Sequence, residues 1–200
     1  MKIVGITQRV VVDPEHGERR DALDQRWPCF ISACDLACVA LPNDAEIAIQ
    51  LADQLGLAGI IFTGGEDLIE YGGRAPERDM TELALLNWVR SRKIPLLGVC
   101  RGMQVVQHSF GVKLERVTGH VTTSHPLATE SVMRDVNSYH NYASIQDSPD
   151  LVAWAHAADG YIEAIRHRNE NIIGVMWHPE RNAPFDLHDI DLFKSFFGAE

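Results

Sequence analysis

The stretch Ile94-Pro95-Leu96-Leu97-Gly98-Val99-Cys100-Arg101-Gly102-Met103-Gln104 decides the fold. Leu96 to Val99 is an apolar run without polar alternation, which is typical of a strand covered on both faces. Beyond it, apolar residues recur with helical spacing at Met103, Val106 and Phe110. The pattern predicts a buried strand that runs directly into a helix, with Cys100 on the turn between them.

The residues around Cys100 predict a nucleophile elbow with cysteine in place of serine. Gly98 and Gly102 flank Cys100 two residues away on each side, and small residues there permit the sharp turn that pushes a side chain into a cleft. The helix N-terminus would point at the sulfur, where its partial positive charge favours thiolate over thiol. A buried structural cysteine at a strand end is the alternative.

A second stretch, Gly174-Val175-Met176-Trp177-His178-Pro179-Glu180, favours the catalytic interpretation. Its apolar part leads to a histidine and, two residues later, to a carboxylate. A cysteine nucleophile needs a base within hydrogen-bond reach and a third group that orients the base. Pro179 stiffens the chain between His178 and Glu180. We therefore predict that these two residues complete a catalytic triad with Cys100.

Together the motifs resemble those of the class I glutamine amidotransferase superfamily. Cys100-Arg101-Gly102-Met103-Gln104 with His178-Pro179-Glu180 is similar to its triad, and Thr63-Gly64-Gly65-Glu66-Asp67 stands where that superfamily has its oxyanion loop. The three motifs span most of the chain in the family's order. The resemblance implies that Cys100 attacks a γ-glutamyl carbonyl and that water hydrolyses the resulting thioester.

Further roles follow around the reacting carbonyl. The elbow geometry predicts the backbone N–H of Arg101 as one oxyanion donor. The resemblance implies a second donor from the backbone of Gly65, beside Gly64 in the substrate-binding loop, where a glycine permits close approach. Gln104 lies at i+4 from Cys100 on the same helix face. It is similar to a glutamine that holds the glutamyl group, and bracing the elbow is its alternative role.

The segment Asn137-Ser138-Tyr139-His140 is similar to one that lines the substrate pocket in the γ-glutamyl hydrolase branch. The resemblance implies that Asn137, Ser138, Tyr139 and His140 contact the substrate. A simple polar turn is the alternative for the segment, and a supporting position behind the substrate is the alternative for His140. We expect ordinary surface or core roles for the other seven histidines, and no metal or cofactor.

The N-terminal part suggests a leaving group. Gly5-Ile6-Thr7-Gln8-Arg9 and residues 17–27 resemble a small subgroup that includes the γ-glutamyl-CDP-amidate hydrolases of bacterial capsule phosphoramidate synthesis. Arg9 follows a predicted strand, at the edge where open α/β sheets bind ligands, and its guanidinium fork would match a diphosphate. Whether Arg19, Arg20 and Arg26 also contact substrate, or only pair with acidic neighbours on a solvated helix, stays open.

Other functions remain open on the sequence alone. A γ-glutamyl amine hydrolase of the γ-glutamyl-GABA type would use the same triad. A glutaminase subunit would need a partner synthetase to receive its ammonia, and only that alternative implies a protein partner. A non-catalytic binding protein on this fold has no chemical need for an intact triad. Monomer and homodimer are both compatible with the sequence.

The order of the predicted elements is βαβαβαβα followed by shorter strands, which predicts a parallel sheet with helices on both faces. We expect a flavodoxin-like three-layer α/β/α sandwich, with a mostly parallel central sheet and extra C-terminal antiparallel strands, in a single amidotransferase-like domain over residues 1–200. The predicted strands cover residues 2–7, 36–41, 59–62, 96–99, 112–117, 130–135, 151–157, 161–167 and 172–177. The predicted helices cover residues 21–35, 79–92 and 187–197, the helix after Cys100, and one capped by Asn43 that turns Ile47, Ala48, Leu51 and Leu55 to one face. Residues 10–20 and 67–78 are predicted to be irregular.

Composition narrows the function classes. The 200 residues carry 28 acidic and 18 basic side chains, a net charge of −10, which disfavours a nucleic-acid or anionic-membrane surface. No apolar run approaches the ~20 residues of a membrane span, and Met1-Lys2 leads into a strand without a signal-peptide pattern. We expect a cytoplasmic protein that acts on a small molecule. Cys29, Cys34 and Cys38 fit no zinc spacing and are expected to be reduced thiols.

Overall fold

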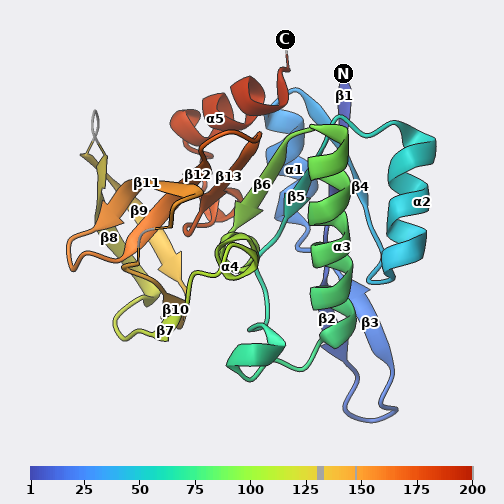
Figure 1. Ribbon diagram of the computed structural model, residues 1–200, viewed down its shortest axis with the longest axis horizontal. Helices are drawn as coiled ribbons and strands as arrows, with labels where there is room; N and C mark the ends of the chain where they lie inside the picture. The colour runs from blue at the N-terminus through green and yellow to red at the C-terminus, as the bar shows by residue number, and fades with distance from the viewer. Residues whose placement is uncertain (130–132, 147, 200) are drawn as a thin grey trace.

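The structure is a computed structural model that describes residues 1–129, 133–146 and 148–199. Its centre is a nine-stranded sheet in the order β4-β1-β5-β6-β13-β12-β11-β8-β9 (Figure 1). The strands from β4 to β13 are parallel, and each of the following strands is antiparallel to its neighbour. Their bounds are β1 Lys2–Ile6, β4 Leu36–Ala40, β5 Gly59–Phe62, β6 Leu96–Val99, β8 Val121–Thr129, β9 Met133–Tyr139, β11 Leu151–Ala157, β12 Ile162–His167 and β13 Ile172–Val175.

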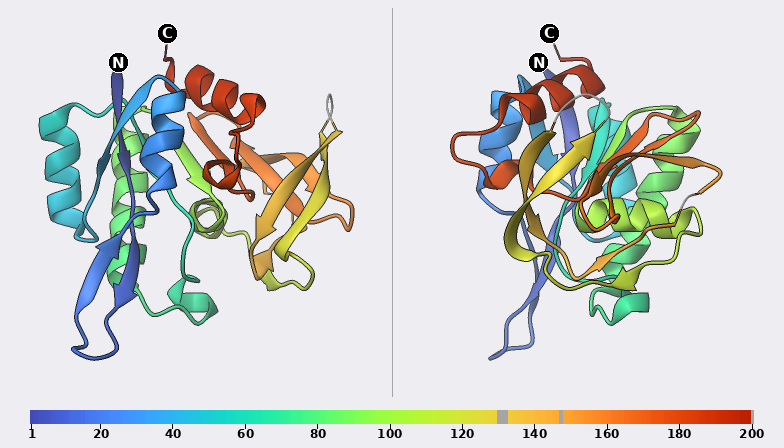
Figure 2. Two further views of the ribbon diagram at one scale, coloured as in Figure 1. Left: turned by 180° about the vertical axis from the view of Figure 1, so that it is seen from behind. Right: turned by 90° about the vertical axis from the view of Figure 1, so that its left-hand side faces the viewer.

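Helices cover both faces of the parallel part (Figure 2). One apolar core lies between the sheet and three helices, α2, α3 and α4, and the other between the sheet and α1 with α5. The predicted three-layer sandwich with extra antiparallel strands is thus confirmed. The helix bounds are α1 Arg26–Ala33, α2 Ala45–Leu55, α3 Pro76–Arg92, α4 Arg101–Ser109 and α5 Leu187–Phe197, and short 3-10 turns lie at η1 Ile69–Tyr71 and η2 Pro179–Arg181.

The prediction of a loop over residues 10–20 is wrong. A β-hairpin of β2 (Arg9–Val12) and β3 (Arg19–Ala22) projects from the molecule (Figure 1). The β-branched run Val10-Val11-Val12 favours a strand, and Gly17 at a φ of 67° supplies the turn. The helix predicted from residue 21 therefore begins only at Arg26.

The predicted cap of α2 is also wrong, and its predicted apolar face is only partly buried, with Ala48 in the core and Leu51 packed against it. Asp44 is the N-cap, and its carboxylate accepts a hydrogen bond from the backbone N–H of Ile47. Asn43 instead donates to Asp21 of the hairpin at 2.7 Å. The helix buries Ala48 and Ala52, whereas Ile47 and Leu55 are 49% and 45% exposed, because two small residues one turn apart let α2 approach the core closely.

In the C-terminal half, β8 was not predicted, because the polar and proline-containing run Thr122–Pro126 has no strand periodicity. The strand predicted over residues 112–117 shrinks to β7 (Glu115–Arg116), paired with β10 (Tyr142–Ala143). Residues 130–132 of another predicted strand lie outside the described residues, and β9 runs on to Tyr139.

The helix α3 starts three residues earlier than predicted. Pro76 lies in its first turn, where a backbone N–H would have no partner within the helix, so its absence removes no hydrogen bond.

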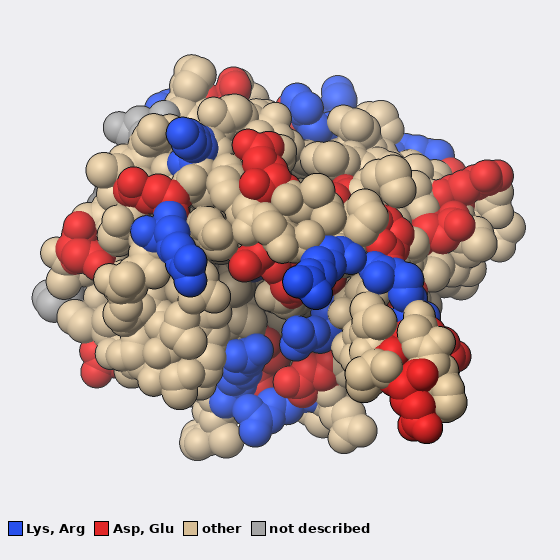
Figure 3. All heavy atoms as spheres, turned by 90° about the horizontal axis from the view of Figure 1, so that it is seen from below, with Lys and Arg blue, Asp and Glu red and all other residues tan. Residues whose placement is uncertain are grey.

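The parallel strands direct their carboxyl ends to one edge, at the bottom of Figure 1. Thr63, Cys100 and His178 follow strands β5, β6 and β13 at that edge. Figure 3 looks onto this side and shows lysine and arginine side chains gathered near its middle, with acidic side chains among and around them. Within the described ranges, none of the helices is both long and apolar enough for a membrane crossing.

Candidate active site

Cys100 occupies a strained turn between β6 and α4. Its backbone has φ 51° and ψ −107°, a conformation that costs free energy for any residue with a Cβ. A hydrogen bond from the Cys100 N–H to the Val175 carbonyl, at 2.7 Å, anchors the turn to β13. The thiol is 5% exposed. The strand, sharp turn and helix that the sequence predicts are therefore all present.

The two glycines that flank Cys100 are required by packing. A Cβ on Gly98 would lie 2.5 Å from the carbonyl carbon of Gly102. A Cβ on Gly102 would lie 2.3 Å from the carbonyl oxygen of Phe62 on the neighbouring strand. Both distances are far below van der Waals contact, so only glycine lets α4 leave the sheet at this angle.

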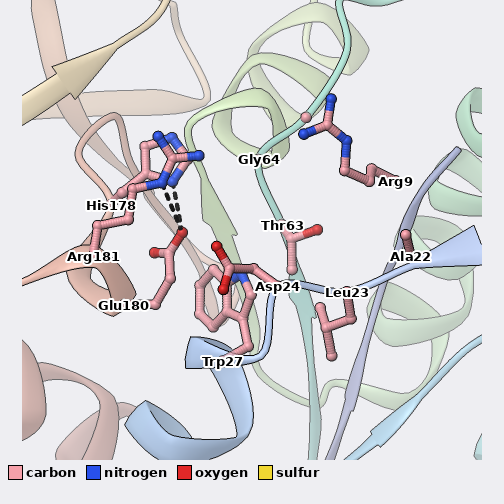
Figure 4. Close-up of a pocket in the computed structure, with 11 residues that line it drawn as sticks. Arg9, Ala22, Leu23, Asp24, Trp27, Thr63, Gly64, His178, Glu180 and Arg181 are labelled. Atoms are coloured by element: carbon pink, nitrogen blue, oxygen red, sulfur yellow. Dashed lines mark hydrogen bonds and ion pairs between the residues drawn. The ribbon is translucent and has the colours of Figure 1, made fainter. Parts of the chain in front are cut away.

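His178 and Glu180 form a buried pair beside the elbow. The Nδ1 atom of His178 lies 2.7 Å from a carboxylate oxygen of Glu180, and the two side chains are 3% and 2% exposed (Figure 4). Gly64 makes room for the ring, since a Cβ there would lie 2.4 Å from the Cε1 atom of His178. The oxyanion-loop motif and the histidine motif are thus packed directly against each other.

The environment of His178 favours the imidazolium. Burial of the ring lowers its pKa, but the charge and hydrogen bonding of Cys100, followed by the hydrogen bond and charge of Glu180, outweigh burial and raise the pKa from 6.5 to about 9. A protonated ring next to the sulfur stabilises the thiolate. The site thus holds a cysteine sulfur beside an imidazole whose pKa is raised, both of them buried.

Asn137, in β9, holds the backbone of His178. Its side-chain oxygen accepts a hydrogen bond from the His178 N–H, and its amide donates one to the His178 carbonyl, each at 2.8 Å. The next residue, Ser138, is buried and donates to the His120 carbonyl. Tyr139 packs its ring edge-on against His178, with centroids 5.6 Å apart. Asn137 and Tyr139 thus contact the catalytic histidine candidate, Ser138 is directed toward His120, and none of the three lines the cavity beside His178.

Two other predicted substrate contacts also point elsewhere. Gln104 is buried and donates a hydrogen bond to the Tyr142 carbonyl at 2.9 Å, which is the bracing role named as its alternative. His140 is buried, and its Nδ1 atom lies 3.1 Å from the same carbonyl. The structure therefore places both residues behind the site, where they fix the segment after β9 against α4.

Arg78 is an important residue that sequence reasoning missed. Its side chain is fully buried and donates to the carbonyls of Thr63 and Gly64 at 2.8 and 3.1 Å. It also pairs with Glu66 at 2.9 Å and with Glu82 at 3.1 Å. Because Arg78 holds these carbonyls, it sets the direction of the loop's backbone N–H groups. An arginine with a glutamate at i+4 on the inward face of α3 was the available signal.

The Arg101 side chain turns away from the cleft. It is 1% exposed and pairs with Asp79 and Glu82, so these carboxylates already occupy its guanidinium. Burial raises the pKa of Glu82, but the charges of Arg101 and then Arg78, with a hydrogen bond from Thr7, outweigh burial and lower it. This ionised network lies beneath both the elbow and the oxyanion loop.

A cavity of about 50 Å³ opens beside His178 and Glu180 (Figure 4). Thr63, Gly64 and Gly65 form one wall and Trp27 another, and Arg9 and Arg181 also line it. Since one water needs roughly 10–15 Å³ by this measure, the cavity has room for only a small group, and Cys100 is not among the residues that line it. Trp27 and Arg181 were not predicted as site residues.

The four arginines of the N-terminal part differ in their partners. Arg19 pairs with Glu77 at 2.5 Å, and Arg20 pairs with Glu18 at 2.5 Å. Arg26 donates to the Arg181 carbonyl at 3.3 Å. Within residues 1–129, 133–146 and 148–199, the exposed Arg9 guanidinium has neither a hydrogen bond nor an ion pair, and it lines the cavity. Arg9 alone among the four is therefore both free and at the site.

Comparisons with known proteins identify the family. The model of the family Glutamine amidotransferase class-I matches residues 31–197. A γ-glutamyl-CDP-amidate hydrolase from Campylobacter jejuni is 33% identical over 97% of this chain and 96% of its own length. A γ-glutamyl-γ-aminobutyrate hydrolase from Escherichia coli O157:H7 is 29% identical over 80% of this chain and 79% of its own.

Solved structures share the fold. A putative GMP synthase subunit from Thermoplasma acidophilum superposes with a TM-score of 0.73 at 19% identity, covering 99% of this chain and 93% of that one. A glutamine amidotransferase from Thermotoga maritima superposes with a TM-score of 0.71 at 13% identity, covering 97% and 83%.

Proposed function

The chain belongs to the Glutamine amidotransferase class-I family, and from that premise we propose that it is a cysteine-dependent hydrolase of γ-glutamyl amides. The observation that carries the proposal is the position of Cys100. It stands on a positive-φ elbow beside a buried histidine whose pKa is raised by the sulfur itself. A structural cysteine needs neither the strain nor the paired imidazolium.

In the proposed reaction the Cys100 thiolate attacks the γ-carbonyl carbon of the glutamyl group. A carbon–sulfur bond forms, and the carbonyl π electrons move to the oxygen. The tetrahedral intermediate then expels the amide nitrogen, which takes its proton from His178. In the second half, neutral His178 removes a proton from water, the hydroxide attacks the thioester, and glutamate leaves as the thiolate re-forms. Glu180 keeps the imidazole oriented and balances its charge.

The oxyanion would receive hydrogen bonds from two backbone N–H groups, those of Arg101 and Gly65. Support for the second comes from the buried Arg78, which holds the adjacent carbonyls of Thr63 and Gly64. Donors fixed in advance cost no reorganisation when charge develops, and the loss of one typically costs about 2.7–4 kcal/mol of transition-state stabilisation.

For the substrate we propose a γ-glutamyl nucleotide phosphoramide such as γ-glutamyl-CDP-amidate. With the γ-carbonyl at Cys100 beside His178, a leaving group would extend along the cavity lining that includes His178 and Arg9. A guanidinium there can bind phosphate oxygens through two parallel hydrogen bonds. The name of the relative that covers almost the whole chain also supports this class. A γ-glutamyl amine such as γ-glutamyl-γ-aminobutyrate is the second candidate, on the strength of the other hydrolase relative.

The direct test is Cys100→Ser with glutamate release as the assay. We expect turnover to fall by at least about 10³-fold with substrate binding retained, because serine does not readily form the anion. In the wild type, rapid quenching and intact-mass analysis should find a glutamyl adduct on Cys100. As a matched control, Cys29→Ser changes an exposed cysteine and should keep full turnover. Undiminished turnover in Cys100→Ser would rule out the proposed chemistry.

A further inference from the structure

Three histidines and a glutamate converge in the antiparallel part of the sheet, and the proposed hydrolysis does not use them. They come from the loop before β8, from β8, from the end of β9 and from β12, strands that lie together on the left of Figure 1. Their ligand-type atoms all lie within 4.8 Å of one another. We call this group the His/Glu cluster, and its members are His120, His125, His140 and Glu163.

The distances in the cluster match the edges of a coordination tetrahedron. One carboxylate oxygen of Glu163 lies 3.3 Å from His140 Nε2, 3.6 Å from His120 Nδ1 and 3.6 Å from His125 Nε2. Four ligands about 2.0–2.1 Å from a tetrahedral metal ion are roughly 3.4 Å apart. Direct hydrogen bonds between nitrogen and oxygen would be shorter, near 2.9 Å.

The nitrogen and oxygen atoms that face the centre of the cluster are not engaged in hydrogen bonds to other described residues. Within the described parts of the chain, each of the three inward histidine nitrogens and both carboxylate oxygens of Glu163 lack a hydrogen-bond partner. The Glu163 and His140 side chains are fully buried, and His120 is 5% exposed. Burying so many unpaired polar atoms together is costly unless something binds them.

The outer ring nitrogens determine which way the lone pairs point. His120 Nε2 lies 2.9 Å from the Asp159 carboxylate, and His140 Nδ1 lies 3.1 Å from the Tyr142 carbonyl. His125 Nδ1 lies 3.4 Å from the Pro126 carbonyl. Each outer nitrogen therefore faces an acceptor to which it can donate, and a ring that donates there presents its inward nitrogen to a metal ion. Metal-binding histidines are held in this way by their surroundings.

We propose that the His/Glu cluster binds one Zn²⁺ ion in a closed, structural site. Imidazole nitrogen and carboxylate oxygen are both ligands that zinc accepts in tetrahedral sites, and four protein ligands leave no open position for a reacting water. Without an ion, three nitrogen lone pairs face the Glu163 carboxylate, which is unfavourable. A Zn²⁺ ion would bind all four groups through metal–ligand bonds. The carboxylate offsets part of the ion's charge in this buried setting.

The position of the cluster indicates what the ion would do. The Tyr142 carbonyl that orients His140 also accepts the hydrogen bond from Gln104 of α4. The Glu163 carbonyl accepts from the Met176 N–H at 2.8 Å, just before His178. A bound ion would tie β8, β9 and β12 together behind the active site, so we expect it to stabilise the fold without joining the reaction.

The test uses the full chain, stripped with a chelator and then titrated with Zn²⁺ or Co²⁺. We expect about one equivalent to bind per chain, with the visible absorption of tetrahedral Co²⁺ and a higher midpoint of thermal unfolding. His125→Gln, at the least buried ligand, and Glu163→Gln should each weaken binding by at least about tenfold. The control His156→Gln changes an exposed histidine of β11 and should bind as the wild type does.

Three results would overturn the proposal. The first is that the stripped wild type binds less than about one-fifth of an equivalent of metal. The second is an unfolding midpoint that does not change when metal is added. The third is equal metal uptake by the wild type and all the variants. If both ligand variants prove too unstable to purify, the wild-type Co²⁺ spectrum still decides, because exposed surface histidines give octahedral ions with weak absorption. Glutamate release is not needed for any of these measurements.

Discussion

The side chain of Asn137 forms hydrogen bonds with both the backbone N–H and the backbone carbonyl of His178, each at 2.8 Å. Asn137 lies in β9 at the far edge of the sheet, whereas His178 follows β13 in its parallel part. The amide therefore joins the antiparallel extension to the catalytic histidine candidate. Both hydrogen bonds are to the backbone of His178, so Asn137 fixes the main chain from which the ring extends.

Asn137→Ala should lower kcat about 10–100-fold with little change in KM, because two backbone groups lose their partners and the ring loses its position. Steady-state kinetics of glutamate release measures both constants. Asn169→Ala, at an exposed asparagine, is the matched control and should match the wild type. A rise in KM with unchanged kcat would instead indicate that Asn137 contacts the substrate.

The pH dependence should reflect His178. Its pKa is raised from 6.5 in the unfolded chain to about 9, so the stabilisation from its protonated form is complete below pH 6.5 and is lost as the pH rises through about 9. The value of kcat/KM should fall over the same alkaline range, since a neutral ring cannot protonate the departing nitrogen.

Glu180→Gln should move that alkaline fall to lower pH, because it removes a carboxylate that helps to raise the His178 pKa. The measurement is kcat/KM from about pH 6 to pH 10 for both proteins. Circular dichroism of the variant should show an intact fold. An alkaline limb at the same pH in both proteins would argue that His178 and Glu180 are not coupled in the reaction.

Arg78→Lys should reduce both activity and stability. Lysine keeps the charge but cannot reach two carbonyls and two carboxylates at once. We expect the free energy of unfolding to drop by about 3 kcal/mol and kcat to drop by about 10²-fold. Arg90→Lys alters an exposed ion pair with Glu170 and should change stability by less than about 1 kcal/mol. Normal kcat in Arg78→Lys would show that the oxyanion loop keeps its direction without this arginine.

Arg9→Lys tests the leaving group. With a γ-glutamyl nucleotide phosphoramide, kcat/KM should fall about tenfold, because lysine loses the two-pronged contact with phosphate. With a phosphate-free γ-glutamyl amine, the value should stay the same. Arg20→Lys, in the Glu18 pair, is the control for general charge effects. Equal losses on both substrates would assign Arg9 to the scaffold or the glutamyl pocket.

Much of the fold could be predicted from local patterns. The buried run Leu96 to Val99 followed by helical spacing specifies β6 and α4, and the alternating strand and helix signals specify a parallel sheet with two covered faces. Gly98 and Gly102 indicated the elbow, because positions too crowded for a Cβ atom must be glycine, and glycine is recognisable in the sequence. The hairpin of β2 and β3 was missed, because its only strand signal is the short β-branched run Val10-Val11-Val12 and its second strand, Arg19–Ala22, is mostly polar.

Tertiary structure alone decided what surrounds the triad candidates. Asn137 and His178 are 41 residues apart, and the His/Glu cluster joins His120 and His125 to the distant His140 and Glu163, so no short spacing reveals either whole set of contacts. Likewise, the inward turn of Gln104 and the free guanidinium of Arg9 depend on which neighbours the fold brings near. Covalent order and periodicity determine which elements form, whereas the partners of a polar side chain are determined by packing between elements that are distant in sequence.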